Sequence, residues 1–191
     1  MARTSSTQRL PLGSSPPRFR LPDAGGKFWA SDEIAGGRPM VVVFACNHCP
    51  YVIHVREKLG QLAAEYGKQG VAFVALNSND VTQYPEDAPA KMPAFAQEAG
   101  WNFPYLVDET QEVAHSWHAA CTPDFFLLDA AGNLAYAGQM DPTRPKSDQV
   151  ATGQDLRAAM DAVLAKKPVP SPQIPSLGCN IKWKPGNEPK F

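Results

Sequence analysis

Two runs of apolar residues, Met40–Ala45 and Val71–Asn77, form the strongest pattern in the chain. Polar residues are almost absent from both runs, which is typical of strands that are buried on both faces of a sheet. Between them, Tyr51–Tyr66 spaces its apolar residues at the intervals of an amphipathic helix. The pattern therefore predicts a strand, a covering helix and a second strand as the centre of the fold.

The rest of the chain continues this alternation of strands and helices. Met92–Gly100 has the pattern of a short helix ended by glycine, and Val81–Pro93 is a loop interrupted by prolines. The other predicted elements are a hairpin of Arg18–Leu21 with Lys27–Trp29, a strand Tyr105–Val107, a helix Glu109–Ala120, a hairpin of Phe125–Asp129 with Leu134–Ala137, and a helix Gln154–Ala165. Such an order predicts an α/β fold whose mixed central sheet is covered by helices on both faces.

The two ends of the chain differ in composition from its middle. Met1–Pro17 is polar and rich in Ser and Pro, so we expect a flexible, extended or disordered arm before a domain at residues 18–167. The segment 168–191 carries six prolines, which argues against regular structure there. It also carries Cys179 and Trp183, which a simple linker does not need, so we expect this tail to pack on the domain.

Charge and hydropathy narrow the possible partners. The formal net charge of −1 gives no reason to expect nucleic acid or an anionic membrane, and no apolar run approaches the length of a membrane span. Met1–Gly13 lacks the apolar core of a secretion signal, so we expect a cytoplasmic protein. Four cysteines are too few for a disulfide scaffold in a chain of 191 residues, which favours redox or metal chemistry.

Two of these cysteines, Cys46 and Cys49, form a C-x-x-C motif where the first buried strand gives way to the helix. Proline is favoured at the first helical position, so Pro50 makes Cys49 the residue that caps the helix N-terminus. The helix dipole and the free N–H groups there favour a thiolate. Cys49 is therefore the candidate nucleophile and Cys46 the candidate resolving thiol, with His48 able to add positive charge. Alternatively, both cysteines are small buried hydrophobic residues at a tight turn.

Three motifs make the chain resemble a known family. The strand–Cys–Pro–helix unit, the run Val71–Asn77 and the segment Cys121–Asp129 are similar to the redoxin branch of the thioredoxin superfamily. Asn-His-Cys-Pro-Tyr-Val around Cys49 and Gly-Cys-x-Ile-Lys-Trp at Gly178–Trp183 resemble its peroxiredoxin-like group, together with the alkyl hydroperoxide reductase/thiol-specific antioxidant proteins. The resemblance covers roughly residues 12–187.

This resemblance implies a thioredoxin-like three-layer α/β/α sandwich with a mixed central sheet, an N-terminal hairpin and a Pro-rich C-terminal tail. It also implies that Thr122 and Pro123 form a cis-proline turn that faces Cys49 and binds extended peptide or thiol substrates, beside Pro50. No organic cofactor is implied. The sequence alone would equally suit an ordinary trans bond at Pro123.

The chain departs from the motifs of both thioredoxins and peroxiredoxins. Aligned on Phe44, Cys49 takes the position of the first thioredoxin cysteine, whereas Val52 stands in place of the second. Peroxiredoxins place an upstream Pro, a Thr or Ser three residues before the reactive cysteine, and a later Arg around it. In this chain Cys46 stands in place of the Thr or Ser, and Pro123 stands in place of the Arg. The strand before the motif contains no Pro. The donors that polarise a peroxide bond are therefore missing.

We interpret the chain as a thiol–disulfide oxidoreductase in which the Cys49 thiolate attacks a disulfide and Cys46 or Cys179 resolves the mixed intermediate. Protein or low-molecular-weight thiols and disulfides would be its substrates, and a dithiol partner would reduce it. Cys121 lies next to Thr122 and is either close to the active centre or a core residue. The oligomeric state and the disulfide pairing stay open.

Other functions are compatible with the same residues. In a thiol peroxidase with antioxidant activity, Cys49 would become a sulfenic acid and condense with a second thiol. In a metal-binding protein, Cys46, Cys49 and His48 would combine with Cys121 or Cys179 as ligands.

Two further hypotheses, a second metal site and a protein without thiol chemistry, are also compatible with the sequence. A second metal cluster would use His115, His118 and Cys121, and a redox-inert binding module would use no thiol chemistry at all. Three acidic residues in the Pro-rich loop are interpreted as a solvated rim: Asp80, Glu86 and Asp87.

Overall fold

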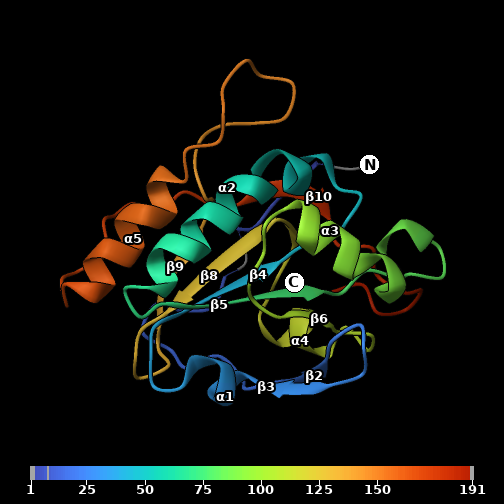
Figure 1. Ribbon diagram of the computed structural model, residues 1–191, viewed down its shortest axis with the longest axis horizontal. Helices are drawn as coiled ribbons and strands as arrows, with labels where there is room; N and C mark the ends of the chain where they lie inside the picture. Colours follow the sequence, from blue (N-terminus) through green and yellow to red (C-terminus); the bar gives the residue numbers. More distant parts are fainter. Residues whose placement is uncertain (1–2, 8, 190–191) are drawn as a thin grey trace.

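The computed structural model describes residues 3–7 and 9–189 and has a five-stranded sheet, which lies at the centre of the molecule (Figure 1). The strand order is β6-β5-β4-β8-β9, in which β4, β5 and β6 are parallel and β8 and β9 are antiparallel to their neighbours. The strands are β4 (Met40–Phe44), β5 (Ala72–Asn77), β6 (Tyr105–Val107), β8 (Asp124–Leu128) and β9 (Leu134–Gly138). All residues of β4 and β5 are buried, which confirms the two predicted central strands.

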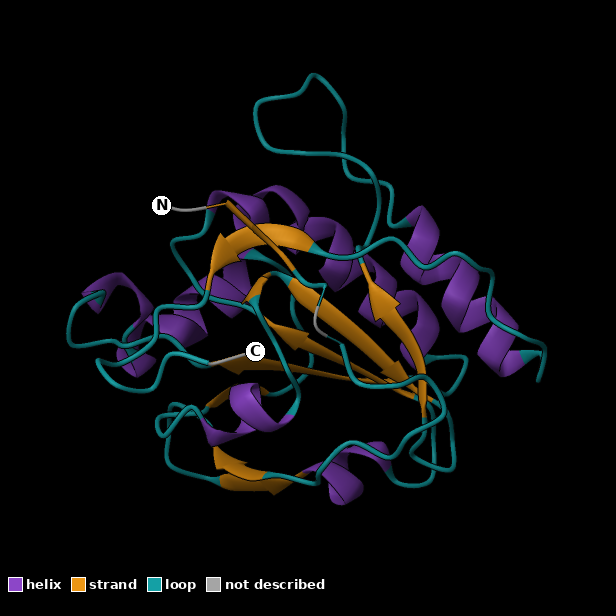
Figure 2. Ribbon diagram, turned by 180° about the vertical axis from the view of Figure 1, so that it is seen from behind, coloured by secondary structure: helices purple, strands orange, loops and turns teal. Residues whose placement is uncertain are grey.

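Helices cover both faces of this sheet (Figures 1 and 2). On one face lie α2 (Pro50–Gly67), α3 (Met92–Glu98) and α5 (Gln154–Leu164). On the other lie α1 (Ser31–Ala35), α4 (Glu112–Ser116) and a hairpin of β2 (Arg20–Pro22) with β3 (Phe28–Ala30). Alternate residues of β4 point into separate cores: Val41 and Val43 pack under α2, and Val42 and Phe44 pack on the opposite side. The predicted three-layer arrangement is confirmed.

The helix predicted at Glu109–Ala120 is shorter in the structure, where α4 covers Glu112–Ser116. Gln111 before it has a positive φ of 66°, and its buried side-chain amide donates to the carbonyl oxygens of Ser78 and Lys182. These contacts hold Gln111 in a left-handed conformation that an α-helix cannot include. His118 also has a positive φ, so the helix has ended before it.

Both ends of the chain contain strands that were not predicted. β10 (Leu177–Asn180) lies in the tail, where the prolines argued against regular structure, and it pairs with β1 (Arg3–Ser5) on one side and β7 (Cys121–Thr122) on the other. Arg3–Ser5 is therefore a paired strand and not part of a flexible arm; Met1, Ala2 and Gln8 of that arm lie outside the described residues. The tail does pack on the domain.

Two 3-10 turns, η1 (Pro85–Asp87) and η2 (Pro89–Lys91), order the loop between β5 and α3.

None of the helices in the described part of the chain is both long and apolar enough to cross a bilayer.

Candidate active site

The junction between β4 and α2 positions two thiols, as predicted. Cys46 follows the last buried residues of β4, and Cys49 is the N-cap of α2 with Pro50 at the first helical position. Cys49 has an extended backbone with φ −69° and ψ 123°. Both side chains are buried, with relative exposures of 1% for Cys46 and 0% for Cys49. The junction is therefore a dry environment in which neighbouring dipoles act strongly on sulfur.

The segment that faces these thiols is Thr122–Pro123, joined by a cis peptide bond. In its thiol form, Cys49 donates from Sγ to the Thr122 carbonyl oxygen at 3.0 Å. The Cys46 sulfur lies 3.4 Å from Thr122 Oγ1. The structure thus brings together the residues that the sequence predicted for catalysis and substrate contact at this turn.

The C-terminal strand β10 brings a third thiol to the same place. Cys179 pairs in register with Thr122 and, across the strand, with Arg3. Its side chain is hydrogen-bonded to Cys49, and only 4% of the residue is exposed. Gly178 makes this approach possible, because a Cβ there would lie 2.1 Å from the Thr122 carbonyl oxygen. Cys179 is therefore held beside Cys49 by backbone pairing.

The three sulfurs differ in how readily they lose a proton. Hydrogen bonds from Cys179 and then from Cys46 hold the pKa of Cys49 far below that of an ordinary thiol, against the opposing effect of burial. Burial, and then the bond to Cys49, raise the pKa of Cys46, and the bond to Cys49 followed by burial raises the pKa of Cys179. Of the three sulfurs, Cys49 is therefore the one that most readily loses its proton.

The N-terminus of α2 contributes less to the low pKa of Cys49 than the C-x-x-C-Pro motif suggested. No hydrogen bond from a helix N–H to the Cys49 side chain meets ordinary geometry, although the Val52 N–H points toward the sulfur closely enough to lower its pKa. The neighbouring thiols thus lower the pKa of Cys49 more than the N–H groups of the helix N-terminus do.

The fourth thiol, Cys121, is fully buried and donates to the Pro123 carbonyl oxygen at 3.5 Å. Burial raises the pKa of Cys121 well above that of an ordinary thiol. Its sulfur is thus held at the turn that contains Pro123, buried in the core and close enough to Cys49 for that thiol to affect its pKa.

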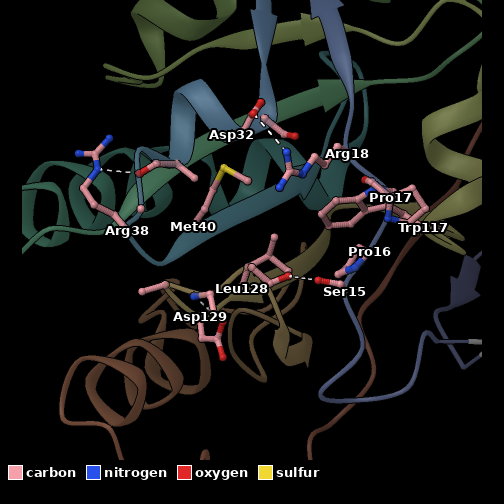
Figure 3. Close-up of a pocket in the computed structure, with 16 residues that line it drawn as sticks. Ser15, Pro16, Pro17, Arg18, Asp32, Arg38, Met40, Trp117, Leu128 and Asp129 are labelled. Atoms are coloured by element: carbon pink, nitrogen blue, oxygen red, sulfur yellow. Dashed lines mark hydrogen bonds and ion pairs between the residues drawn. The ribbon is translucent and has the colours of Figure 1, made fainter.

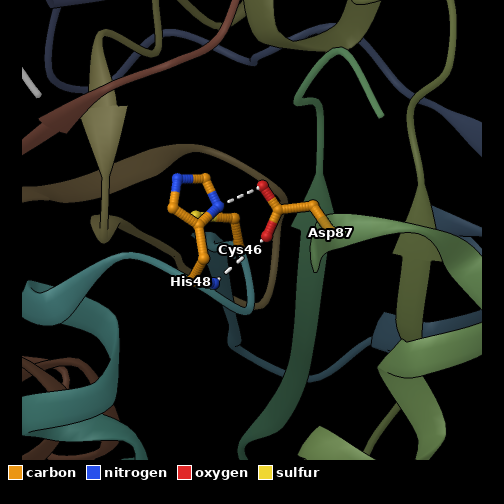
Figure 4. A group of neighbouring side chains, drawn as sticks. All are labelled: Cys46, His48 and Asp87. Atoms are coloured by element: carbon orange, nitrogen blue, oxygen red, sulfur yellow. Dashed lines mark hydrogen bonds and ion pairs between the residues drawn. The ribbon is translucent and has the colours of Figure 1, made fainter. Parts of the chain in front are cut away.

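His48 does not act as a free positive charge beside Cys49. Its Nδ1 lies 2.6 Å from Asp87 Oδ2 (Figure 4). Its ring also stacks on Tyr84, with an angle of 4° between the planes. Asp87 is fully buried and also accepts the backbone N–H groups of Asn47 and His48 and the side-chain amide of Asn79.

The interpretation of the acidic residues as a solvated rim was therefore wrong for Asp87, and also for Asp80, which is 3% exposed. Sequence reasoning missed Asp87 because the loop that carries it looked polar and irregular. The polar run Asn77–Asp80, directly after a buried strand, was the available signal of a buried network there.

One group of potential metal ligands occurs in the described residues, namely Cys46, His48 and Asp87 with donor atoms within 4.8 Å of one another. The 2.6 Å between Nδ1 and Oδ2 is a hydrogen-bond distance, however. Two ligands of a tetrahedral zinc ion at about 2.1 Å lie about 3.4 Å apart. These residues are thus arranged as a hydrogen-bonded network and do not fit a metal centre in this conformation.

The second predicted cluster, His115, His118 and Cys121, is not formed. α4 ends at Ser116, so the two histidines do not share a helix face. His115 contacts the Asn187 carbonyl oxygen and packs on Trp183, with 4.6 Å between the ring centroids.

A cavity of about 240 Å³ lies away from these thiols, at the opposite end of β4 (Figure 3). It is lined by Met40 at the start of that strand, by Trp117 and by Arg18 and Arg38. No cysteine lines it, so it is separate from the thiol centre.

Comparisons with known proteins agree with this fold. A conserved Geobacillus kaustophilus protein of known crystal structure is 46% identical, with a TM-score of 0.93 over 97% of this chain and 98% of that chain. The thiol:disulfide interchange protein DsbE of Escherichia coli is 28% identical over 69% of this chain and 68% of its own. A Mycobacterium tuberculosis protein named "Putative peroxiredoxin" is 28% identical over 60% of this chain and 68% of its own.

The architecture is the thioredoxin-like fold, which solved structures of the thioredoxin family share. The sequence profile described as Redoxin matches residues 11–153, well over half of the chain. The predicted membership of the redoxin branch is thereby confirmed, and the protein belongs to the redoxin family.

Proposed function

We propose that this protein is a thiol–disulfide oxidoreductase whose nucleophile is the Cys49 thiolate. The observation that carries the proposal is the contact of one low-pKa sulfur with two protonated thiols, Cys46 and Cys179, beside a cis-proline turn. A thiolate is the attacking species in disulfide exchange, and a nearby thiol is needed to release the product.

The reaction has two steps. The Cys49 thiolate attacks one sulfur of a substrate disulfide, forms a mixed disulfide and expels the other sulfur as a thiolate. Cys46 or Cys179 then loses its proton and attacks Cys49 Sγ, which releases the second substrate thiol and leaves a disulfide within the protein. Two electrons have passed to the substrate, and an external dithiol returns the protein to its reduced form.

A chromogenic aromatic disulfide tests this scheme. Reduced protein should release one aromatic thiol quickly, when Cys49 attacks, and a second more slowly, when the mixed disulfide is resolved. Cys49→Ser should abolish both phases. Cys46→Ser and Cys179→Ser should each keep the first phase, and the variant that loses the second identifies the resolving thiol. Release unaffected by Cys49→Ser would overturn the proposal.

The substrates that fit this site are cysteine-containing polypeptides or small thiols and disulfides. The name of the E. coli relative, a thiol:disulfide interchange protein, supports exchange between thiols and disulfides. The position of Thr122 and Pro123 against Cys49 supports contact with an extended chain that would take the place of β10, which pairs with β7 at Thr122.

A thiol peroxidase is the second candidate, and the relative named as a peroxiredoxin favours it. The Cys49 thiolate would attack the peroxide, become a sulfenic acid and release water or an alcohol; condensation with a neighbouring thiol would then form a disulfide and water. The rate of reduced protein with hydrogen peroxide, beside Cys49→Ser, tests it. A rate no faster than that of a free thiol would eliminate this candidate.

A further inference from the structure

We propose that His48, held by Asp87, accepts the proton of Cys46 when Cys46 attacks the mixed disulfide at Cys49. This inference rests on the proposed function, because it concerns the second step of that reaction. It assigns a proton acceptor to His48 and a positioning role to Asp87.

The attack of Cys46 on the mixed disulfide needs a proton acceptor, because Cys46 holds its proton strongly and must lose it to become a nucleophile. Burial, its bond to Cys49 and the nearby Asp87 carboxylate all raise the pKa of Cys46. Once Cys49 is part of a disulfide it can no longer take that proton. A general base placed close to the attacking thiol removes this barrier.

The hydrogen bonds around Asp87 determine which imidazole nitrogen is free. Three N–H groups besides the ring already donate to this carboxylate, two of them to Oδ1 and one to Oδ2. An acceptor so surrounded is a carboxylate anion, so Nδ1 of His48 is the donor in the 2.6 Å contact. The lone pair is then on Nε2, which is the buried side-chain polar atom without a hydrogen-bond partner in the described part of the chain.

His48 is also close enough to Cys46 to act. The Cys46 sulfur, a ring nitrogen of His48 and an Asp87 oxygen lie within 4.8 Å of one another (Figure 4). Because Nδ1 is bonded to Asp87, the proton passes from Cys46 Sγ to Nε2 through one bridging water, and the ring stays in place. Stacking on Tyr84 keeps the ring in the plane that its bond to Asp87 requires.

The other groups around His48 are poorer acceptors. Burial raises the pKa of Tyr105 well above its usual value, and its hydroxyl already donates to Asn47 Oδ1 at 3.1 Å. The Lys182 ammonium lies 5.5 Å from the centre of the Tyr84 ring and carries no lone pair. Protonating Asp87 itself would disrupt the bonds that it accepts.

The step balances without an added reagent. The S–H bond of Cys46 breaks and its proton passes to Nε2, while the Cys46 sulfur forms a bond to Cys49 Sγ. The bond between Cys49 and the substrate sulfur breaks, and the departing thiolate takes up a proton as His48 returns its own to solvent. The disulfide moves from the mixed pair to the pair Cys46–Cys49.

The experiment uses the two-phase release of aromatic thiol in a Cys179→Ala background, so that Cys46 is the thiol left to resolve Cys49. His48→Asn is the test variant, because its amide keeps a donor near the position of Nδ1 for Asp87 and removes Nε2. We expect an unchanged first phase and a second phase slowed by at least about tenfold, the lower end for a lost general base. The second phase should then rise more steeply with pH than in the parent, because hydroxide must remove the proton. Added imidazole should restore part of the rate.

His115→Gln is the matched control, since His115 is remote and contacts Asn187 and Trp183 instead; it should leave both phases unchanged. Asp87→Asn is the second test variant and should also slow the second phase, because an amide donor there favours the tautomer whose Nε2 is protonated. A second phase that keeps its rate and pH slope in both variants would refute the role of His48. Absence of the first phase in the parent would instead refute the proposed function, so the two failures are distinguishable.

Discussion

Replacing Gly178 by Ala should raise the pKa of Cys49 without touching any residue of the C-x-x-C motif. A Cβ at position 178 would lie 2.1 Å from the Thr122 carbonyl oxygen and 2.6 Å from its carbon. Both are backbone atoms, so no side-chain rotation relieves the clash. Ordinary contacts need about 3.5 Å, so β10 must move by about 1 Å or more away from β7. Cys179 would move with it.

The size of the effect follows from the bond that is lost. The Cys179 thiol contributes most to the low pKa of Cys49. A hydrogen bond to a charged acceptor contributes about 1.5 to 3 kcal/mol, which corresponds to a change in pKa of about 1 to 2. Since the donor stabilises the thiolate, its loss raises the pKa of Cys49.

Alkylation by iodoacetamide as a function of pH, with Cys49 followed by mass spectrometry, measures this pKa. Gly67→Ala is the control, because a Cβ at Gly67 meets nothing within 4 Å. Cys179→Ala should raise the pKa in the same direction by removing the donor alone. A folded Gly178→Ala variant with the Cys49 pKa of the parent would refute the reasoning that Cys179 stabilises the thiolate through the pairing of β10 with β7.

Three further predictions concern residues around this centre. Burial raises the pKa of Asp124 to about 6, so the folded form keeps a proton that the unfolded chain loses near pH 4; the free energy of unfolding should fall by about 3 kcal/mol as pH rises through this window. Urea unfolding at pH 4 and pH 7 should show this loss in the parent and not in Asp124→Asn. Cys121→Ala should leave both phases of aromatic thiol release unchanged, and a slower phase would place Cys121 in the reaction. Asp87→Ala should lower the free energy of unfolding by about 3 kcal/mol, because it leaves buried N–H groups without an acceptor; a loss below about 1 kcal/mol in urea would contradict that.

Local signals in the sequence were enough to predict the junction between β4 and α2. An uninterrupted apolar run, a C-x-x-C motif and a following proline specify a buried strand, a turn and a helix start within a dozen residues. The position of Cys49 at the N-cap follows from that short-range chemistry alone. The redoxin resemblance then added the facing cis-proline turn, which no local pattern requires.

Long-range pairing was beyond the same reasoning. β1 and β10 are three and four residues long and pair across most of the chain, so neither has enough alternation to signal a strand. Prolines in the tail flank β10 without entering it. Asp87 was missed for a related reason, because its carboxylate accepts N–H groups of Asn47 and His48 from another loop, which no local pattern indicates.

Closure of the site by the chain's own tail constrains how substrates reach it. Cys46, Cys49 and Cys179 are each at most 4% exposed, and β10 occupies the edge of β7 next to Cys49. We expect a polypeptide disulfide to contact Cys49 Sγ only after β10 has moved away from Thr122, and this movement would also remove the thiol that most stabilises the Cys49 thiolate. Opening the site thus makes Cys49 more accessible and more basic at once. Because nucleophilicity rises with thiol pKa while the thiolate fraction falls, the open form attacks faster per thiolate, and exchange with large substrates should depend on pH more strongly than exchange with small ones.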